Sequence, residues 1–217
     1  MEELYGKIKE AFLGFDFDGV KALVREALAR GASPNDVIER ALRPAMEEAG
    51  RRFEKGEFFL AELVVAGDLF KEVMDEILVP EIRKQGGSAR TLGTVVIGTV
   101  RGDLHDIGKS IVATMLRAAG FNVIDLGVDV PPEKFVEAAI QHKADIVAMS
   151  ALLTTTMLEM KNVIEALKRA GIRDKVKVIV GGAAVTEEFA RSIGADGYGE
   201  DAVKAVKISK QLLGIEG

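Results

Sequence analysis

Two residues with acid–base and metal-binding chemistry lie close together in residues 102–109 of this 217-residue chain, GDLHDIGK. Asp103 and His105 are two positions apart, so in an extended segment their side chains lie on the same side and can meet. A carboxylate that accepts from one imidazole nitrogen fixes the tautomer and leaves the other nitrogen for a metal or a proton. Gly102 and Gly108 would let the backbone approach a bulky ligand. The plainer interpretation is a helix-capping loop with an exposed histidine.

The elements on either side determine where this loop lies. Residues 94–100, TVVIGTV, form a β-branched run typical of a buried strand, and residues 111–116 are typical of a helix. The loop therefore follows the carboxyl end of a strand, which is where ligands bind in open α/β sheets. Two further loops, residues 150–156 and 181–184, follow later apolar runs in the same way. In a parallel sheet all three loops lie at one edge and can surround one ligand.

Two other ligand classes compete for such an edge. Glycine loops that precede helices bind phosphate groups, but the chain has no G-x-G-x-x-G after its first strand and no G-x-x-x-x-G-K-[ST]. A phosphoacceptor site of the receiver type would use Asp103 and Asp106. The acidic cluster and lysine expected beside such a site are not evident, and His105 would have no role.

Three motifs in order resemble a known family: Asp103-x-His105-x-x-Gly108, Ser150-x-Leu152 and Gly181-Gly182. Together they resemble the signature of the cobalamin-binding domains of methionine synthase and of the corrinoid proteins that serve methanol and methylamine methyltransferases. The similarity runs from about residue 39 to the C-terminus. It implies cobalamin bound base-off, with His105 as the lower axial ligand of cobalt and with Asp103 and Thr156 completing its hydrogen-bond network. The best known member has serine where this chain has Thr156.

The resemblance also implies which residues contact cobalamin. Around Asp103 and His105, the first loop would contribute Gly102, Leu104, Asp106, Ile107 and Gly108. A slot for the displaced nucleotide tail would be lined by Ser150, Leu152, Thr154, Gly181 and Gly182. The segment that resembles the one closing over this tail contains Tyr198, Gly199 and Ala202.

A segment of the N-terminal half, residues 52–60, resembles the helical module that caps the methyl-bearing face of the cofactor in methionine synthase. By residue match, Phe53 and Leu60 would lie over the methyl group, with Leu63 near them and Glu39 at the cofactor's rim. The family often has proline after this leucine, whereas this chain has alanine. An apolar cap would shield a reactive cobalt–carbon bond from water. The alternative is that Phe53 and Leu60 belong to the core of a helical bundle.

The periodicity of apolar residues predicts helices only in the first part of the chain. The longest is expected at residues 58–78, Pro44 predicts a break or kink near Arg43, and Pro80 is expected to end the helices. A polar, glycine-bearing stretch follows. We therefore predict a helical cap domain at residues 1–86 and a linker at residues 87–93.

After the linker the pattern changes to strands that alternate with helices. Strands are expected at residues 94–100, 122–126, 146–149, 177–180 and 196–198, and helices at residues 107–119, 132–141, 156–170, 187–191 and 201–213. Repeated βα units specify a parallel sheet with helices on both faces. Residues 94–217 should thus form a flavodoxin-like, or Rossmann-like, α/β domain with five parallel strands, which would be the cobalamin-binding domain.

The composition excludes several classes of protein. Lys and Arg number 29 against 34 Asp and Glu, a formal charge of −5 with no basic run, so nucleic acid and membrane surfaces are not expected partners. The absence of cysteine excludes disulfides, thiolate metal sites and cysteine nucleophiles. No apolar run approaches the roughly 20 residues of a membrane span, and the N-terminus lacks signal-peptide features. A cytoplasmic location is expected.

The resemblance implies a methyl carrier that is not an enzyme on its own. It would carry a methyl group on cobalt between a substrate-specific methyltransferase subunit and a second methyltransferase, which acts on coenzyme M or tetrahydrofolate. A reductive activase would be the third partner, and the choice of donor would lie in the first. A cobalamin-binding sensor or regulator and a mutase small subunit stay open as alternatives. The acidic charge argues against the sensor, and the helical cap argues against the mutase subunit.

Overall fold

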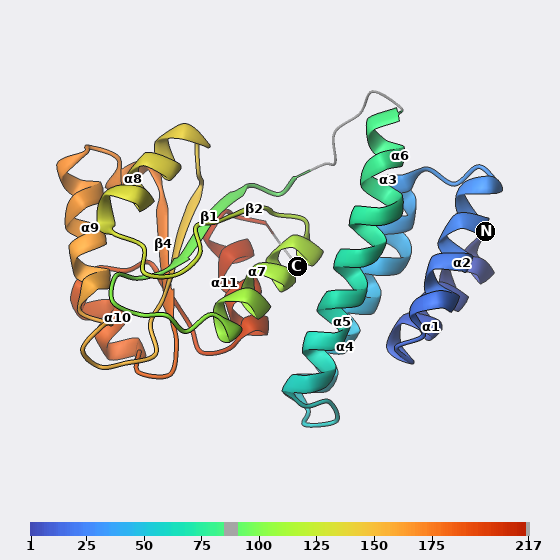
Figure 1. Ribbon diagram of the computed structural model, residues 1–217, viewed down its shortest axis with the longest axis horizontal. Helices are drawn as coiled ribbons and strands as arrows, with labels where there is room; N and C mark the ends of the chain where they lie inside the picture. Colours follow the sequence, from blue (N-terminus) through green and yellow to red (C-terminus); the bar gives the residue numbers. More distant parts are fainter. Residues whose placement is uncertain (85–90, 216–217) are drawn as a thin grey trace. The chain divides into compact units, whose positions relative to one another are not determined.

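The computed structural model describes residues 1–84 and 91–215, and the chain divides into two compact units, Met1–Arg90 and Thr91–Gly217 (Figure 1). The predicted linker, residues 87–93, falls mainly on residues 85–90, which lie outside the described residues. The predicted domain boundaries therefore stay a prediction. None of the helices in the described ranges is long and apolar enough to span a membrane.

The N-terminal unit is built from helices. In chain order they are α1 (Glu2–Leu13), α2 (Phe17–Ala29), α3 (Pro34–Val37), the π-helical turn η1 (Ile38–Leu42), α4 (Arg43–Glu54), α5 (Leu60–Val73), the π-helical turn η2 (Met74–Leu78) and α6 (Val79–Lys84). Asp16 Oδ1 accepts from Gly19 N at 2.9 Å and Ser33 Oγ accepts from Asp36 N at 3.0 Å, so side chains satisfy amides that would otherwise lack partners at these helix starts. The largest fully buried side chains of this unit include Ile8, Phe12, Leu42, Leu69 and Leu78.

Two prolines lie within helical stretches without ending them. A proline lacks the amide donor, and its ring clashes with the carbonyl four residues earlier. Directly before Pro44 lies the π turn Ile38–Leu42, and directly before Pro80 lies the π turn Met74–Leu78. The wider π turn makes room for the ring, so the chain stays helical from Leu60 to Lys84. The prediction that Pro80 ends the helices is therefore wrong, and near Arg43 the chain carries a π turn in place of a break.

The longest predicted helix also starts two residues later than expected. Phe59 is its N-cap, and Phe59 N donates to Glu62 Oε2 at 2.8 Å, which fixes the first turn at Leu60. Phe59 itself is exposed.

The C-terminal unit is a five-stranded parallel sheet with the strand order β2-β1-β3-β4-β5, which confirms the predicted fold class. Its strands are β1 (Thr94–Thr99), β2 (Asn122–Asp125), β3 (Ile146–Ser150), β4 (Lys177–Gly181) and β5 (Gly197–Gly199). Its helices are α7 (Ile107–Ala119), α8 (Pro132–Gln141), α9 (Glu159–Arg169), the 3₁₀ turn η3 (Arg173–Lys175), α10 (Glu187–Ile193) and α11 (Ala202–Leu212). The helix expected at residues 156–170 begins later, at Glu159, because residues 154–158 form turns.

Helices cover both faces of the sheet. On one face α8, α9 and α10 bury residues such as Phe135, Met160 and Ile193 (Figure 1). On the other face α7 and α11 pack on strand residues that alternate with the first set, among them Val95 and Ile97. Because the central strands β1, β3 and β4 are buried on both faces, their polar residues lie at the strand ends.

The strand order places one pair of loops at a topological switch point. The chain leaves β1 to form β2 on one side, and β3 returns to the other side of β1. The loops that follow β1 and β3 therefore diverge, and the crevice between their starts is where open α/β sheets bind ligands. The loop after β1 carries Asp103 and His105, and the loop after β3 carries Leu152 and Thr156.

Candidate cofactor site

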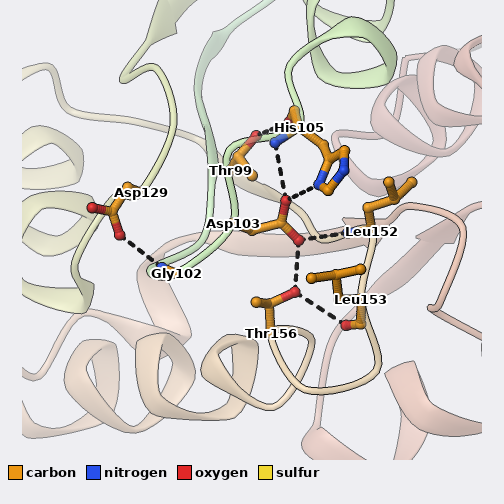
Figure 2. A network of polar contacts seen from close by, with 8 residues as sticks. All are labelled: Thr99, Gly102, Asp103, His105, Asp129, Leu152, Leu153 and Thr156. Carbon is orange, nitrogen blue, oxygen red and sulfur yellow. Dashed lines mark hydrogen bonds and ion pairs between the residues drawn. The ribbon is translucent and has the colours of Figure 1, made fainter.

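The Asp103 carboxylate is the centre of the polar network between these two loops (Figure 2). Its Oδ1 accepts from the backbone N and from Nδ1 of His105, at 3.0 and 2.7 Å. Its Oδ2 accepts from Leu152 N at 2.8 Å and from Thr156 Oγ1 at 2.6 Å. The structure thus brings together Asp103, His105 and Thr156, which the sequence motifs had placed in one network, although 53 positions separate the carboxylate from the threonine.

These contacts determine the charge of Asp103, which is 1% exposed. Burial on its own raises the pKa of the carboxyl group, but the hydrogen bonds from Thr156, from Leu152 N and from His105 outweigh it and hold the pKa well below its usual range. Asp103 is therefore ionised at neutral pH. The Thr156 hydroxyl also lies 3.1 Å from Leu153 O, but it has one proton, and the shorter, charge-assisted contact to Asp103 takes it.

The charge of Asp103 fixes the tautomer of His105. An ionised carboxylate only accepts hydrogen bonds, so the proton between Oδ1 and Nδ1 belongs to Nδ1. In the neutral imidazole the lone pair is then on Nε2, which has no hydrogen-bond partner among the described residues. The side chain is 53% exposed, so this nitrogen is accessible to a ligand. His105 is thus held as a directed nitrogen donor.

Exposed apolar side chains lie on the same two loops as this donor. Leu104 and Ile107 on the same loop are 71% and 73% exposed, and Leu152 and Leu153 on the facing loop are 40% and 45% exposed. A β-carbon added to Gly108, in the first turn of α7, would meet no atom within 4 Å. Across the described ranges, no group of three or more His, Asp or Glu residues could hold a metal ion. The residues present therefore fit a flat, largely apolar group whose metal brings most of its own ligands and takes one nitrogen from the protein.

Comparison with known proteins identifies the family. Models described as a B12 binding domain match residues 93–207 and, separately, residues 4–78. The trimethylamine corrinoid protein 1 of Methanosarcina acetivorans is 47% identical over 98% of both chains, and the dimethylamine corrinoid protein of Methanosarcina barkeri is 45% identical over 98% of both. The solved methanol:cobalamin methyltransferase complex MtaBC from Methanosarcina barkeri matches with a TM-score of 0.86 at 35% identity, over 98% of this chain and 80% of that chain. The chain belongs to the B12-binding corrinoid proteins.

This corrinoid protein is a member of the family found in methylamine and methanol methyltransferase systems, as its sequence motifs predict. Its cofactor is cobalamin or a related corrinoid.

The glycines predicted to line a slot have a structural reason of their own. A β-carbon on Gly181 would lie 2.6 Å from Gly199 O, and one on Gly182 would lie 2.0 Å from Ala151 O. Neighbouring backbones approach so closely at the carboxyl ends of β3, β4 and β5 that side chains are excluded. Gly182 also has a φ of +118°, which favours glycine. Their role beside a nucleotide tail stays a prediction.

The other predicted slot residues of the corrinoid protein lie along the same edge. Ser150 is the last residue of β3, Thr154 is exposed in the turns that precede α9, and Tyr198 lies in β5. Burial raises the pKa of the Tyr198 hydroxyl, and the nearby Glu200 carboxylate acts in the same direction. Ala202 is buried at the start of α11, where Asp201 Oδ1 accepts from Lys204 N at 2.8 Å. The predicted slot residues therefore all lie at the carboxyl edge of the sheet. Among the described contacts, no hydrogen-bond network like that of Asp103 joins them.

The predicted cap residues of the helical unit differ in exposure. Leu60 is 50% exposed and Phe53 is partly buried, so Leu60 is not a core residue as the bundle alternative required. Leu63 is 1% exposed and belongs to the buried set. Glu39 is exposed and forms an ion pair with Arg43. Their contacts with the cofactor stay predictions.

Sequence reasoning missed two residues that support the His105 loop. Thr99, the fully buried last residue of β1, donates from Oγ1 to His105 O at 2.9 Å. Lys109 is 3% exposed and lies between the carboxylates of Asp106, at 2.8 Å, and Asp125. A polar residue that ends an apolar strand, and a lysine directly after the last glycine of the motif, were the available signals.

Proposed function

We propose that this chain holds cobalamin base-off with His105 as the lower axial ligand and carries a methyl group between two methyltransferases. The first would be a substrate-specific subunit, the second would pass the methyl group to coenzyme M or tetrahydrofolate, and a reductive activase would restore the cofactor after oxidation. The observation that supports this proposal is the state of His105. Its Nδ1 is hydrogen-bonded to a buried, ionised carboxylate, and its side chain is 53% exposed on a loop that also carries exposed apolar side chains.

The chain's own contribution is to orient and tune one nitrogen. Asp103 keeps the proton on His105 Nδ1, which points the lone pair of Nε2 outward and raises its basicity. Thr156 donates to the other carboxylate oxygen and so withdraws part of the charge that Asp103 offers to the imidazole. The strength of the axial donor thus depends on three side chains that lie in two loops.

The exposed apolar residues on the loops of His105 and Leu152 would exclude water from the bound cofactor. Leu104, Ile107 and Leu152 expose side chains that would contact the edges and lower face of a corrin ring and be buried by it. The cobalt of the bound corrinoid supplies the methyl-carrying chemistry. The protein supplies the ligand, the orientation and a dry surface.

The relatives favour methylamines as the class of methyl donor. Proteins named for trimethylamine and dimethylamine are 47% and 45% identical to this chain, whereas the solved methanol complex is 35% identical. We therefore assign the first partner to the methylamine-specific methyltransferases.

Reconstitution with hydroxocobalamin tests the proposal. The purified chain is expected to retain cobalamin stoichiometrically, with the ultraviolet–visible spectrum of a base-off, histidine-coordinated corrinoid. His105→Ala should lose the histidine-coordinated spectrum. His142→Ala is the matched control, because His142 is the other histidine of the chain and lies exposed at the C-cap of α8. A His105→Ala protein with the wild-type spectrum would contradict the ligand assignment, and a wild-type chain that retains no corrinoid would contradict the whole proposal.

A further inference from the structure

Asp129 has a backbone conformation that side chains rarely adopt. It lies in the loop between β2 and α8, and its φ is +53°. Left-handed conformations are unfavourable for residues with a β-carbon, although Asp and Asn adopt them more readily than most. The side chain is exposed, so packing does not account for the strain.

The left-handed conformation brings two polar groups of Asp129 onto the segment that carries Asp103 (Figure 2). Asp129 Oδ1 accepts from Gly102 N at 2.7 Å, and Asp129 N donates to Asp103 O at 2.9 Å. The two contacts are made at the two ends of the Gly102–Asp103 backbone, one at Gly102 N and one at Asp103 O. They hold Gly102 and Asp103 from the side opposite to Leu152 and Thr156.

The same stretch makes a tight turn. Asp103 N donates to Val100 O at 3.1 Å, and Gly102, at the third position of this turn, has a φ of +80°. A positive φ at that position is what a type II turn requires. With the contacts from Asp129, the backbone N and O of Asp103 both have partners, so the direction in which its carboxylate leaves the chain is fixed before any ligand binds.

We propose that Asp129 is a positioning residue for His105. It holds the Gly102–Asp103 backbone so that the Asp103 carboxylate meets His105 Nδ1 and the axial nitrogen is already oriented when the cofactor arrives. This inference rests on the proposed role of His105, since a positioned nitrogen matters only if it binds the cobalt. Asp129 acts through the loop and touches neither His105 nor the cofactor face in the described contacts.

Three variants of the full-length chain separate the contact from the strain. Asp129→Ala removes the acceptor and keeps the strain, whereas Asp129→Gly removes both. Asp129→Asn keeps an oxygen acceptor and a residue type that tolerates a positive φ. Lys143→Ala is the matched control, because Lys143 is exposed with a φ of +50° in the turn after α8, away from this loop.

The first measurement uses the apoprotein. Proton NMR reports the His105 Nδ1–H as a downfield resonance while the imidazole is hydrogen-bonded to Asp103. The resonance should be present in the wild type, in Asp129→Asn and in Lys143→Ala, and should be lost to solvent exchange in Asp129→Ala and Asp129→Gly. The second measurement is the dissociation constant for hydroxocobalamin, which should rise roughly five- to tenfold in the Ala and Gly variants and stay within about twofold in the others, as expected for loss of one hydrogen bond.

The outcomes decide between the two proposals. A downfield resonance and an affinity unchanged in both Asp129→Ala and Asp129→Gly would overturn the role of Asp129, and so would an equal loss in Asp129→Asn. If Asp129→Ala does not fold, Asp129→Gly gives the answer without the strain. If wild-type protein fails to bind hydroxocobalamin, the proposed function fails, while the apoprotein resonance still tests whether Asp129 positions His105.

Discussion

The two units of this chain position their predicted site residues by different means. In the α/β unit, residues far apart in sequence meet at one carboxylate, because parallel strands deliver their loops to the same edge. In the helical unit, the predicted residues are spread over η1, α4 and α5. Their exposure differs, since Leu63 is buried and Leu60 is exposed. A polar network therefore joins Asp103, His105 and Thr156, whereas the predicted cap residues have in common only their place in the helical unit.

The difference shows for which residues a sequence motif shared with a known family predicts the position of a side chain. A motif at the end of a strand specifies position and direction together, since the sheet fixes both. A residue on a helix specifies neither until the packing of that helix is known.

The largest effect is expected for Leu63, whose predicted contact with the cofactor competes with its burial. Leu63→Ala should lower the free energy of unfolding of the apoprotein by about 2–5 kcal/mol, because it leaves a cavity in place of a fully buried leucine. Leu60→Ala, at a side chain that is 50% exposed, should lower it by less than about 1 kcal/mol. Urea unfolding followed by circular dichroism measures both. Equal losses would mean that exposure does not distinguish the two residues.

The next effect concerns Asp103 and its pH dependence. Asp103→Asn should destabilise the apoprotein by about 2–3 kcal/mol at pH 7, because an amide has one acceptor oxygen where the carboxylate accepts from both. The folded-state pKa of Asp103 lies below its unfolded value, so its contribution is present above about pH 4 and is lost as the pH falls through the folded pKa.

Urea unfolding at a series of pH values checks that sign. The difference in free energy of unfolding between wild type and Asp103→Asn should be constant from pH 7 to about pH 5 and should shrink below about pH 4. A difference that grows on acidification would contradict the ionised state of Asp103. It would also remove the argument that places the His105 proton on Nδ1.

The order of elements in the α/β unit was predictable from the sequence, and the details around the site were not. A change from helical segments alone to apolar runs that alternate with helical segments predicts five strands and the three loops at their ends. The start of α9 at Glu159 was missed because residues 154–158 form turns that the pattern of apolar residues does not mark, although the resemblance had placed Thr156 in the Asp103 network. The contact of Asp129 with Gly102 was missed for a similar reason, since it depends on a left-handed φ and on 27 residues of separation.

In the helical unit the wrong prediction came from a local rule. Pro80 was expected to end the helices, but the π turn Met74–Leu78 accommodates the proline ring and the helix continues. Whether a helix widens or breaks at a proline depends on what packs against it. The burial of Leu63 and the exposure of Leu60, three positions apart, likewise follow from packing.

The smallest effect is expected for Thr156, where this chain has one methyl group more than the best known member of the family. Thr156→Val removes the hydroxyl that donates to Asp103 Oδ2 and should destabilise the apoprotein by about 1–2 kcal/mol. Thr156→Ser keeps the donor and removes one methyl group from a side chain that is 8% exposed, so the cost should be below about 1 kcal/mol.

The spectrum of the reconstituted protein sharpens this last comparison. Thr156→Val leaves Asp103 with a larger share of its charge for the imidazole, so His105 should donate more strongly to cobalt, and the corrinoid bands should shift relative to the wild type. Thr156→Ser should match the wild type in band positions. If Thr156→Ser shifts the bands and Thr156→Val does not, the methyl group and not the hydroxyl controls the geometry, and the network around Asp103 is then set by packing, as in the helical unit.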